Sequence, residues 1–152
     1  MKSDLTFTST AYSNGDIQNY QFDAKQETIL AFFPGAFTSV CTDEMCTIQD
    51  KLSNLEDLEA KIVGISVDTP FALKEFATQN ELDFILVSDT SREIISQYDV
   101  ETKIPELGYK VAKRAVFVVR EGEIIYKEVL DDPSNLPDIQ RLKETLARVG
   151  NV

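Results

Sequence analysis

The sequence predicts an α/β fold in which a central mixed β-sheet is flanked by helices on both faces. Short apolar runs of strand length alternate with longer segments whose apolar residues recur every three or four positions. A strand pair and a terminal helix follow this alternation, and no Pro/Gly/Ser-rich linker interrupts it. Because 152 residues can bury a real hydrophobic core, we expect a single domain over residues 1–152.

The first expected elements are a hairpin and a buried strand. Polar and aromatic residues alternate on both sides of the turn signal Ser13–Asp16, which predicts a hairpin. The run Glu27–Phe33 is almost wholly apolar and ends at Pro34, as is typical of a strand buried on both faces. From about residue 38 to 58, apolar residues recur at threes and fours, which predicts a helix.

The rest of the chain continues the alternation and ends with a second hairpin and a helix. Strands are expected over residues 61–67, 84–87, 115–119 and 123–129, and helices over about 70–80, 91–98 and 135–149. The dipeptide Glu121-Gly122 is expected to be the turn of the second hairpin, and a loop is expected around residues 105–109. This order of elements is thioredoxin-like.

Composition and charge exclude several kinds of partner. The formal net charge of −11 disfavours binding to phosphate backbones and to anionic lipid surfaces. No stretch reaches the roughly 18 apolar residues of a membrane span, and the first residues lack the layout of a signal peptide. We therefore expect a cytoplasmic protein without nucleic acid or membrane partners.

The chain has two cysteines and no histidine. In the reducing cytosol two cysteines favour a catalytic or redox pair over a structural disulfide. The absence of histidine excludes Ser-His and Cys-His nucleophile chemistry as well as a histidine-ligated metal site. A Gly-rich phosphate loop is also missing, so no metal, flavin, haem or nucleotide cofactor is expected.

Cys41 occupies the position where the buried strand passes into the helix. If Thr38 caps the helix, Cys41 falls in the first turn, where unpaired N–H groups and the helix dipole favour an anion such as a thiolate. The thiolate is the nucleophilic form of cysteine. The alternative is that Cys41 is a small buried apolar residue.

The pattern Pro34-x-x-x-Thr38-x-x-Cys41 resembles the active-site motif of the peroxiredoxin family. This resemblance implies that Pro34 shields the cysteine, that the Thr38 hydroxyl bonds to peroxide and thiolate, and that Cys41 attacks the peroxide. The segment Lys113–Val119 resembles the family's Arg-x-x-Phe strand, which makes Arg114 the candidate for the stabilising cation. Its alternative role is a surface arginine.

The resemblance covers roughly residues 27–130 in order, with two departures. The usual Gly-x-x-Ala-Pro-x-Phe opening is not present near the N-terminus, and Asp99 stands where the family commonly has glycine. By resemblance to the bacterioferritin-comigratory or Q-type members, Cys46 would resolve the Cys41 sulfenic acid as an internal disulfide. Five helical residues rise about 7.5 Å and turn by roughly 140°, so this disulfide requires local unwinding of the helix.

Two roles remain open in this helix. Cys46 resolves Cys41, or it is a core residue and an external thiol resolves Cys41. Glu44 is expected as a solvated carboxylate that supports the helix N-terminus, with an ion pair to Arg114 as the alternative.

The function that accounts for most of these residues is a thiol peroxidase for hydrogen peroxide and organic hydroperoxides. A thioredoxin-like or other dithiol protein would reduce the disulfide between Cys41 and Cys46, and the protein would be a monomer or a homodimer. The alternatives are a thiol-disulfide oxidoreductase, which the spacing of four residues between the cysteines disfavours, and a redox-sensing module on the same fold.

Overall fold

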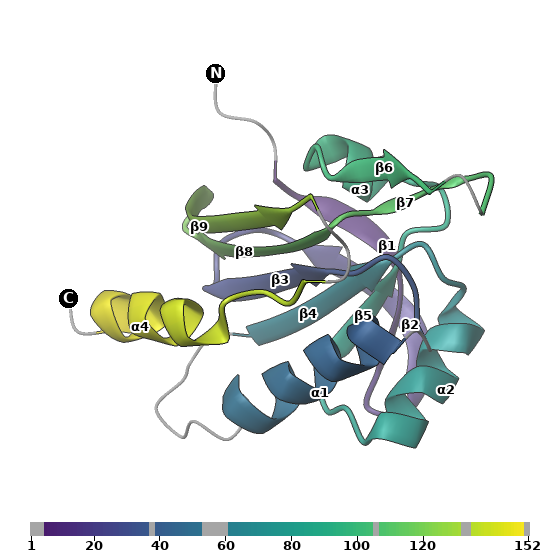
Figure 1. Ribbon diagram of the computed structural model, residues 1–152, viewed down its shortest axis with the longest axis horizontal. Helices are drawn as coiled ribbons and strands as arrows, with labels where there is room; N and C mark the ends of the chain where they lie inside the picture. The colour runs from purple at the N-terminus through teal and green to yellow at the C-terminus, as the bar shows by residue number, and fades with distance from the viewer. Residues whose placement is uncertain (1–4, 37–38, 53–60, 105–106, 132–134, 151–152) are drawn as a thin grey trace.

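A seven-stranded mixed sheet is the centre of the molecule (Figure 1). The computed structural model describes residues 5–36, 39–52, 61–104, 107–131 and 135–150. In sheet order the strands are β2 (Asp16–Phe22), β1 (Phe7–Ser13), β5 (Ile85–Ser88), β4 (Lys61–Ser66), β3 (Thr28–Phe32), β8 (Arg114–Arg120) and β9 (Glu123–Leu130). The three central strands are parallel, whereas the strands on either side of them run antiparallel to their neighbours.

Both predicted hairpins form, at opposite edges of this sheet. In the β1–β2 turn, Asn14 and Gly15 have φ angles of 50° and 88°. In the β8–β9 turn, Glu121 and Gly122 have φ angles of 51° and 77°. Two successive left-handed residues are what a two-residue turn of type I′ requires, so the turn dipeptides explain the connections.

The helices are α1 (Ser39–Leu52), α2 (Pro70–Asn80), α3 (Glu93–Gln97) and α4 (Ile139–Gly150). Thr69 caps α2 by accepting a hydrogen bond from the Ala72 amide at 3.2 Å. Helix α4 begins four residues later than expected, because Asp138 acts as its cap and accepts from the Arg141 amide at 3.0 Å.

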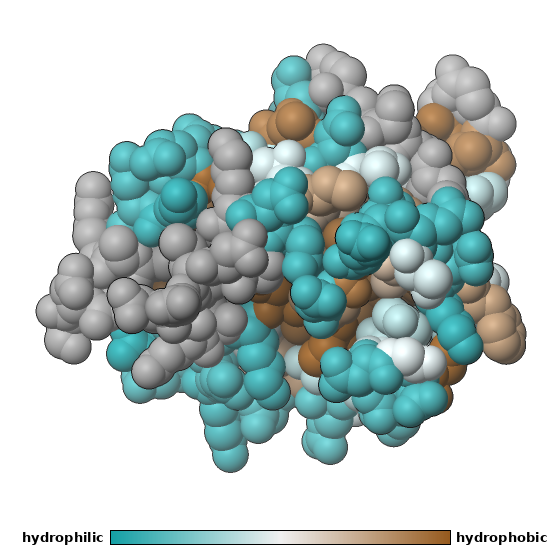
Figure 2. All heavy atoms as spheres, turned by 90° about the horizontal axis from the view of Figure 1, so that it is seen from below, coloured by the Kyte–Doolittle hydropathy of each residue, from teal (hydrophilic) through white to brown (hydrophobic). Residues whose placement is uncertain are grey.

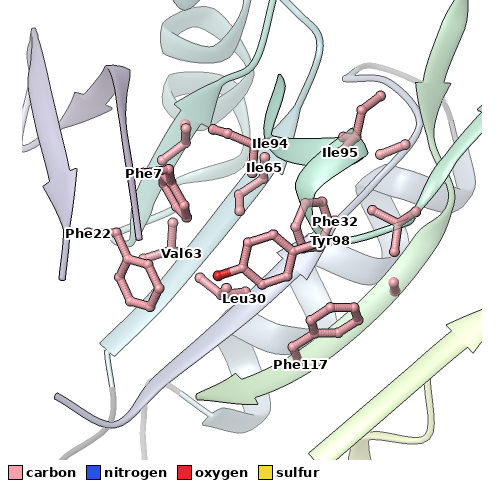
Figure 3. Packing of buried hydrophobic residues seen from close by; sticks show 14 of the residues in the cluster. Phe7, Phe22, Leu30, Phe32, Val63, Ile65, Ile94, Ile95, Tyr98 and Phe117 are labelled. Carbon is pink, nitrogen blue, oxygen red and sulfur yellow. The ribbon is translucent and has the colours of Figure 1, made fainter. Parts of the chain in front are cut away.

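Two apolar layers enclose the sheet. On one face, buried residues of α1, α2 and α4 pack against the strands. On the other face lie α3 and a small strand pair (Figure 1). In this second layer the rings of Phe32, Tyr98 and Phe117 meet with centroids 5.4 to 5.6 Å apart (Figure 3). The predicted mixed sheet with helices on both faces is confirmed.

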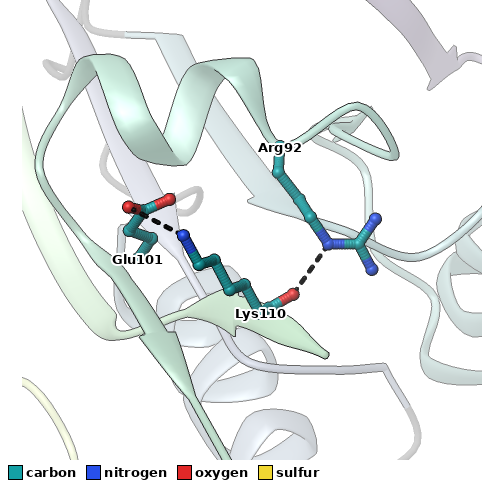
Figure 4. Close-up of polar contacts among 3 residues, drawn as sticks. All are labelled: Arg92, Glu101 and Lys110. Carbon is teal, nitrogen blue, oxygen red and sulfur yellow. Dashed lines mark hydrogen bonds and ion pairs between the residues drawn. The ribbon is translucent and has the colours of Figure 1, made fainter. Parts of the chain in front are cut away.

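The small strand pair is an element that the sequence pattern did not predict. It consists of β6 (Glu101–Lys103) and β7 (Lys110–Ala112), which flank the expected loop. The Arg92 Nε donates to the Lys110 carbonyl at 2.9 Å, and the Lys110 ammonium lies 3.5 Å from the Glu101 carboxylate (Figure 4). The pair is therefore fastened to the residue that precedes α3.

Asp99, which departs from the glycine common in the resembling family, has a left-handed φ angle of 56°. Glycine adopts this conformation without strain, and aspartate is among the residues that tolerate it best. The departure thus keeps the backbone geometry that a glycine would provide.

The face seen from below is largely hydrophilic, with apolar atoms showing in a smaller central area (Figure 2). Within the described parts of the chain, no helix combines the length and apolar character needed to cross a membrane.

Candidate active site

Strand β3 positions the start of α1. All five β3 residues are buried, between the parallel strand β4 and the antiparallel strand β8. The Phe33 amide donates to the Ile65 carbonyl at 3.0 Å, which extends the pairing with β4 by one residue. Helix α1 begins six residues later, with Cys41 as its third residue. The chain therefore leaves the centre of the sheet and enters α1 over a short connection.

Two of the predicted site residues fall outside this description. Thr38 lies outside the described residues. The backbone of Cys41 belongs to α1, whereas its side chain is not among those described. The predicted placement of Cys41 in the first turn of a helix is confirmed by the bounds of α1.

Pro34 and Arg114 come together, because both line one pocket of about 270 Å³. Its other walls come from the β6–β7 pair and from the ends of β8 and β9: Thr102, Lys103, Ile104, Ala112, Lys113, Leu130 and Asp131. Sequence reasoning missed these walls, since they belong to the strand pair it did not predict and to the strand ends beside it. The pocket lies next to the connection that leads into α1.

Arg114 is a buried residue, with 2% of its surface exposed. Its Nη1 donates to Glu44 Oε1 at 2.5 Å, and Glu44 is 1% exposed. The expectation of a solvated Glu44 is therefore wrong, and the ion pair with Arg114 is correct. The pair joins α1 to the first residue of β8, which places the guanidinium beneath the helix that carries Cys41.

Burial dominates the electrostatics of Glu44. It raises the pKa of this carboxyl group to about 8, while the Arg114 guanidinium acts in the opposite direction. The second carboxyl oxygen, Oε2, is buried and has no hydrogen-bond partner among the described residues. Glu44 is thus held in the interior by one strong contact at a cost in hydration.

Cys46 is a free, half-buried thiol on another side of α1. Its sulfur lies 3.7 Å from Asn80 Oδ1 at the end of α2. Burial raises the pKa of the Cys46 thiol, and the charges of Asp50 and Asp43 add to the effect. A thiol of this kind stays protonated at neutral pH and is a poor nucleophile by itself.

The two cysteines lie in one uninterrupted helix, as the sequence predicted. By position in the helix, Cys41 lies about 60° around the axis from Glu44 and about 140° from Cys46. A disulfide between Cys41 and Cys46 is therefore incompatible with the intact helix.

Asp68 is a further residue near the site that the sequence reasoning missed. It follows β4, and its carboxylate accepts a hydrogen bond from the Ala36 amide at 2.7 Å. The sequence does contain a signal for it. A polar residue just after an apolar strand lies at the carboxyl edge of a parallel sheet, where ligand-binding sites are commonly found.

Comparison with known proteins places this geometry in context. The AhpC/TSA family model matches residues 4–127. Alkyl hydroperoxide reductase C of Buchnera aphidicola (subsp. Baizongia pistaciae) is 34% identical over 94% of this chain and 74% of that protein. Peroxiredoxin Bcp of Escherichia coli K12 is 31% identical over 70% of this chain and 69% of that protein. Among solved structures, Enterococcus faecalis AhpC superposes with a TM-score of 0.82 at 22% identity, over 97% of this chain and 89% of that one.

Proposed function

The chain belongs to the AhpC/TSA family of peroxiredoxins, and we propose that Cys41 carries its thiol-dependent peroxidase activity. The observation that supports this assignment most directly is the shared pocket of Pro34 and Arg114, which lies beside the connection into the helix that holds Cys41. Substrates are hydrogen peroxide and organic hydroperoxides.

In the first step the Cys41 thiolate attacks the terminal oxygen of the peroxide. The S–O bond forms while the O–O bond breaks, which gives a Cys41 sulfenic acid and an alkoxide, or hydroxide from hydrogen peroxide, that takes up a proton and leaves as the alcohol or as water. The N-terminus of α1 and the Arg114 guanidinium stabilise the thiolate and the charge that develops on the leaving oxygen. Thr38 donates its hydroxyl to this site, and Pro34 limits access of water.

In the second step the Cys46 thiol condenses with the Cys41 sulfenic acid, which forms a disulfide and releases water. The first turns of α1 unwind to allow this contact. A thioredoxin-like dithiol protein then reduces the disulfide. The half-buried position and the raised pKa of Cys46 support an order of events in which Cys46 reacts only after opening.

The remaining assignments concern the setting of the enzyme. We infer one domain over residues 1–152 that works in the cytoplasm, as a monomer or homodimer, without nucleic acid or membrane partners. The net charge of −11 supports the last point.

Peroxide consumption by matched serine variants tests the proposal. We expect Cys41→Ser to abolish consumption, and Cys46→Ser to consume one equivalent at the wild-type rate and to stop as a sulfenic acid without a thiol supply. Mass spectrometry after trapping of thiols and sulfenic acids identifies each species. Unchanged consumption by Cys41→Ser would contradict the assignment of Cys41, and an unimpaired thioredoxin-coupled turnover in Cys46→Ser would contradict that of Cys46.

A further inference from the structure

Short polar side chains connect the ends of several strands at one edge of the sheet. Ser66 and Ser88 are the last residues of the parallel strands β4 and β5. The Ser88 hydroxyl donates to the Asp68 carbonyl at 2.6 Å, and the Ser9 hydroxyl of β1 donates to the Ser88 carbonyl at 2.6 Å. Ser66 and Ser88 are buried, so this chain of bonds is partly shielded from water.

The Asp68 carboxylate links this network to the connection between β3 and α1. Its Oδ2 accepts from the Ala36 amide and from the Ser66 hydroxyl, each at 2.7 Å. Ala36 and Asp68 are 32 positions apart in the sequence. Hydrogen bonds to an ionised carboxylate are short and about twice as strong as neutral ones, and these distances fit that class.

The Ala36 amide lies beyond the end of β3 and before the start of α1, so neither element supplies its partner. Asp68 satisfies this amide and is itself held at both ends, its carboxylate by Ser66 and its carbonyl by Ser88. The connection into α1 is thereby tied to the carboxyl ends of β4 and β5.

We propose that Asp68 is a positioning residue of the peroxidase, which holds the Pro34–Ala36 segment in the form that presents Cys41 to the peroxide. The inference rests on the proposed function of Cys41. Ala36 lies two residues after a wall of the pocket and five residues before Cys41. Asp68 does not touch the reacting atoms; it acts through the connection that it anchors.

The two steps of a turnover respond to this anchor in opposite directions. Attack on peroxide needs the closed connection, whereas formation of the disulfide needs α1 to open. We expect Asp68→Ala to slow oxidation of Cys41 by about 10- to 100-fold, the range of a lost hydrogen bond to a charged group. Disulfide formation from the sulfenic acid should accelerate. Rapid quench with alkylation and mass spectrometry follows both steps, which suits a chain without tryptophan.

Asp89 offers a matched control at the end of the neighbouring strand. Its carboxylate accepts from the Ile94 and Ile95 amides at 3.1 and 2.9 Å, and so anchors α3 instead of α1. We expect Asp89→Ala to lose stability without moving the ratio of the two rates. If Asp68→Ala leaves this ratio at the wild-type value, or shifts it no more than Asp89→Ala does, the proposal is overturned.

Two milder variants guard against a protein that fails to fold. Asp68→Asn keeps an acceptor oxygen without the charge and should restore most of the oxidation rate. Ser66→Ala removes one of the two donors to Oδ2 and should shift the ratio in the same direction as Asp68→Ala, but less. Wild-type behaviour of Ser66→Ala combined with no rescue by Asp68→Asn would contradict a role of the carboxylate bonds.

Hydrogen exchange separates failure of this inference from failure of the proposed function. Amide protection at Gly35 and Ala36 and in the first turn of α1 should fall in Asp68→Ala and stay unchanged in Asp89→Ala, whether or not the protein consumes peroxide. If wild-type Cys41 does not react with peroxide, the proposed function fails. Unchanged protection in Asp68→Ala overturns the anchor itself.

Discussion

The contacts that hold Glu44 and Cys46 in helix α1 differ greatly in strength. Glu44 is buried and bonded to the guanidinium of Arg114 at 2.5 Å. About 200° around the axis, the Cys46 sulfur makes a weak contact with Asn80 Oδ1 at 3.7 Å. Farther along α1, Gln49 forms hydrogen bonds of 2.8 and 3.0 Å with Asp83, so the weak hold concerns Cys46 and not the whole side of the helix. One helix thus combines a firmly fixed residue with a loosely held one.

This difference matches the tasks that we assign to the two cysteines. We assign attack on the peroxide to Cys41, whose position in α1 is about 60° around the axis from that of Glu44, and a fixed guanidinium bonded to Glu44 is useful for charge stabilisation. In the proposed cycle Cys46 has to leave its place in every turnover, and a weak contact opposes that movement little. The contrast teaches that firm and weak contacts can be assigned to two residues only two positions apart in a single helix.

Removal of Arg114 should have the largest effect, because it abolishes the contact that fixes Glu44. Arg114→Ala leaves the buried Glu44 carboxyl group without the charged donor of its hydrogen bond, so we expect a loss of about 1.5–3 kcal/mol in the free energy of unfolding. The rate of peroxide reduction should fall about 100- to 1000-fold, because a charge-stabilising donor is lost. Denaturant titration and peroxide kinetics measure the two effects.

Arg120, at the other end of β8 and less buried, provides the control for this experiment. Arg120→Ala should change both quantities far less. Equal losses in the two arginine variants would show that the Glu44 side of α1 is not specially fixed.

Replacement of Glu44 by glutamine tests the Glu44 contact through the pH dependence of protein stability. Since burial raises the Glu44 pKa from 4.5 to about 8, the folded protein holds this proton more tightly than the unfolded chain does. The contribution of Glu44 to stability is therefore full below about pH 4.5 and is lost as the pH rises toward 8. Urea titrations of wild type and Glu44→Gln at pH 5 and pH 9 should show a wild type that loses more stability over this interval.

The exposed neighbour Asp43 controls for a general effect of charge. Asp43→Asn is expected to follow the wild-type dependence on pH. A Glu44→Gln profile parallel to that of the wild type would mean that Glu44 does not titrate in this interval.

The smallest expected effect concerns the contact between Cys46 and Asn80. Asn80→Ala removes the acceptor of the Cys46 thiol, a weak donor, so disulfide formation should accelerate only about two- to fivefold. Oxidation of Cys41 by peroxide should keep its wild-type rate. Gln79→Ala, which removes an exposed side chain that contacts Glu75 on the same helix, is the control. An acceleration above tenfold would place the main restraint on opening at Asn80 instead of at Glu44.

The sequence predicted those parts of the fold that depend on local pattern. Helix α2 has the expected bounds, because Thr69 and Pro70 form a recognisable start. Local sequence patterns also predicted both hairpin turns and the buried strand β3. The β6–β7 pair escaped prediction, since three residues a strand are too few for a period-two pattern to show.

The site was predicted as a set of residues but not as a set of contacts. The bond between Glu44 and Arg114 spans 70 positions in the sequence, and a glutamate near a helix start ordinarily faces water. The bond from Ala36 to Asp68 likewise depends on which strands become neighbours in the sheet. Such contacts follow from tertiary packing, which the local spacing of apolar residues in the sequence does not predict.

The burial of Glu44 also has a consequence for the energy of the redox cycle. Glu44 and Met45 lie between the two cysteines and are almost completely buried, so the proposed unwinding, which would unite the sulfurs, would bring both of them to the surface. Exposure of Met45 and loss of the bond between Glu44 and Arg114 oppose this opening, whereas the Glu44 carboxyl group regains its water shell, which offsets part of the cost. In the proposed cycle, rehydration of Glu44 thus lowers the cost of each opening, and the carboxyl group has to be dehydrated again when the reductant returns the enzyme to its dithiol form.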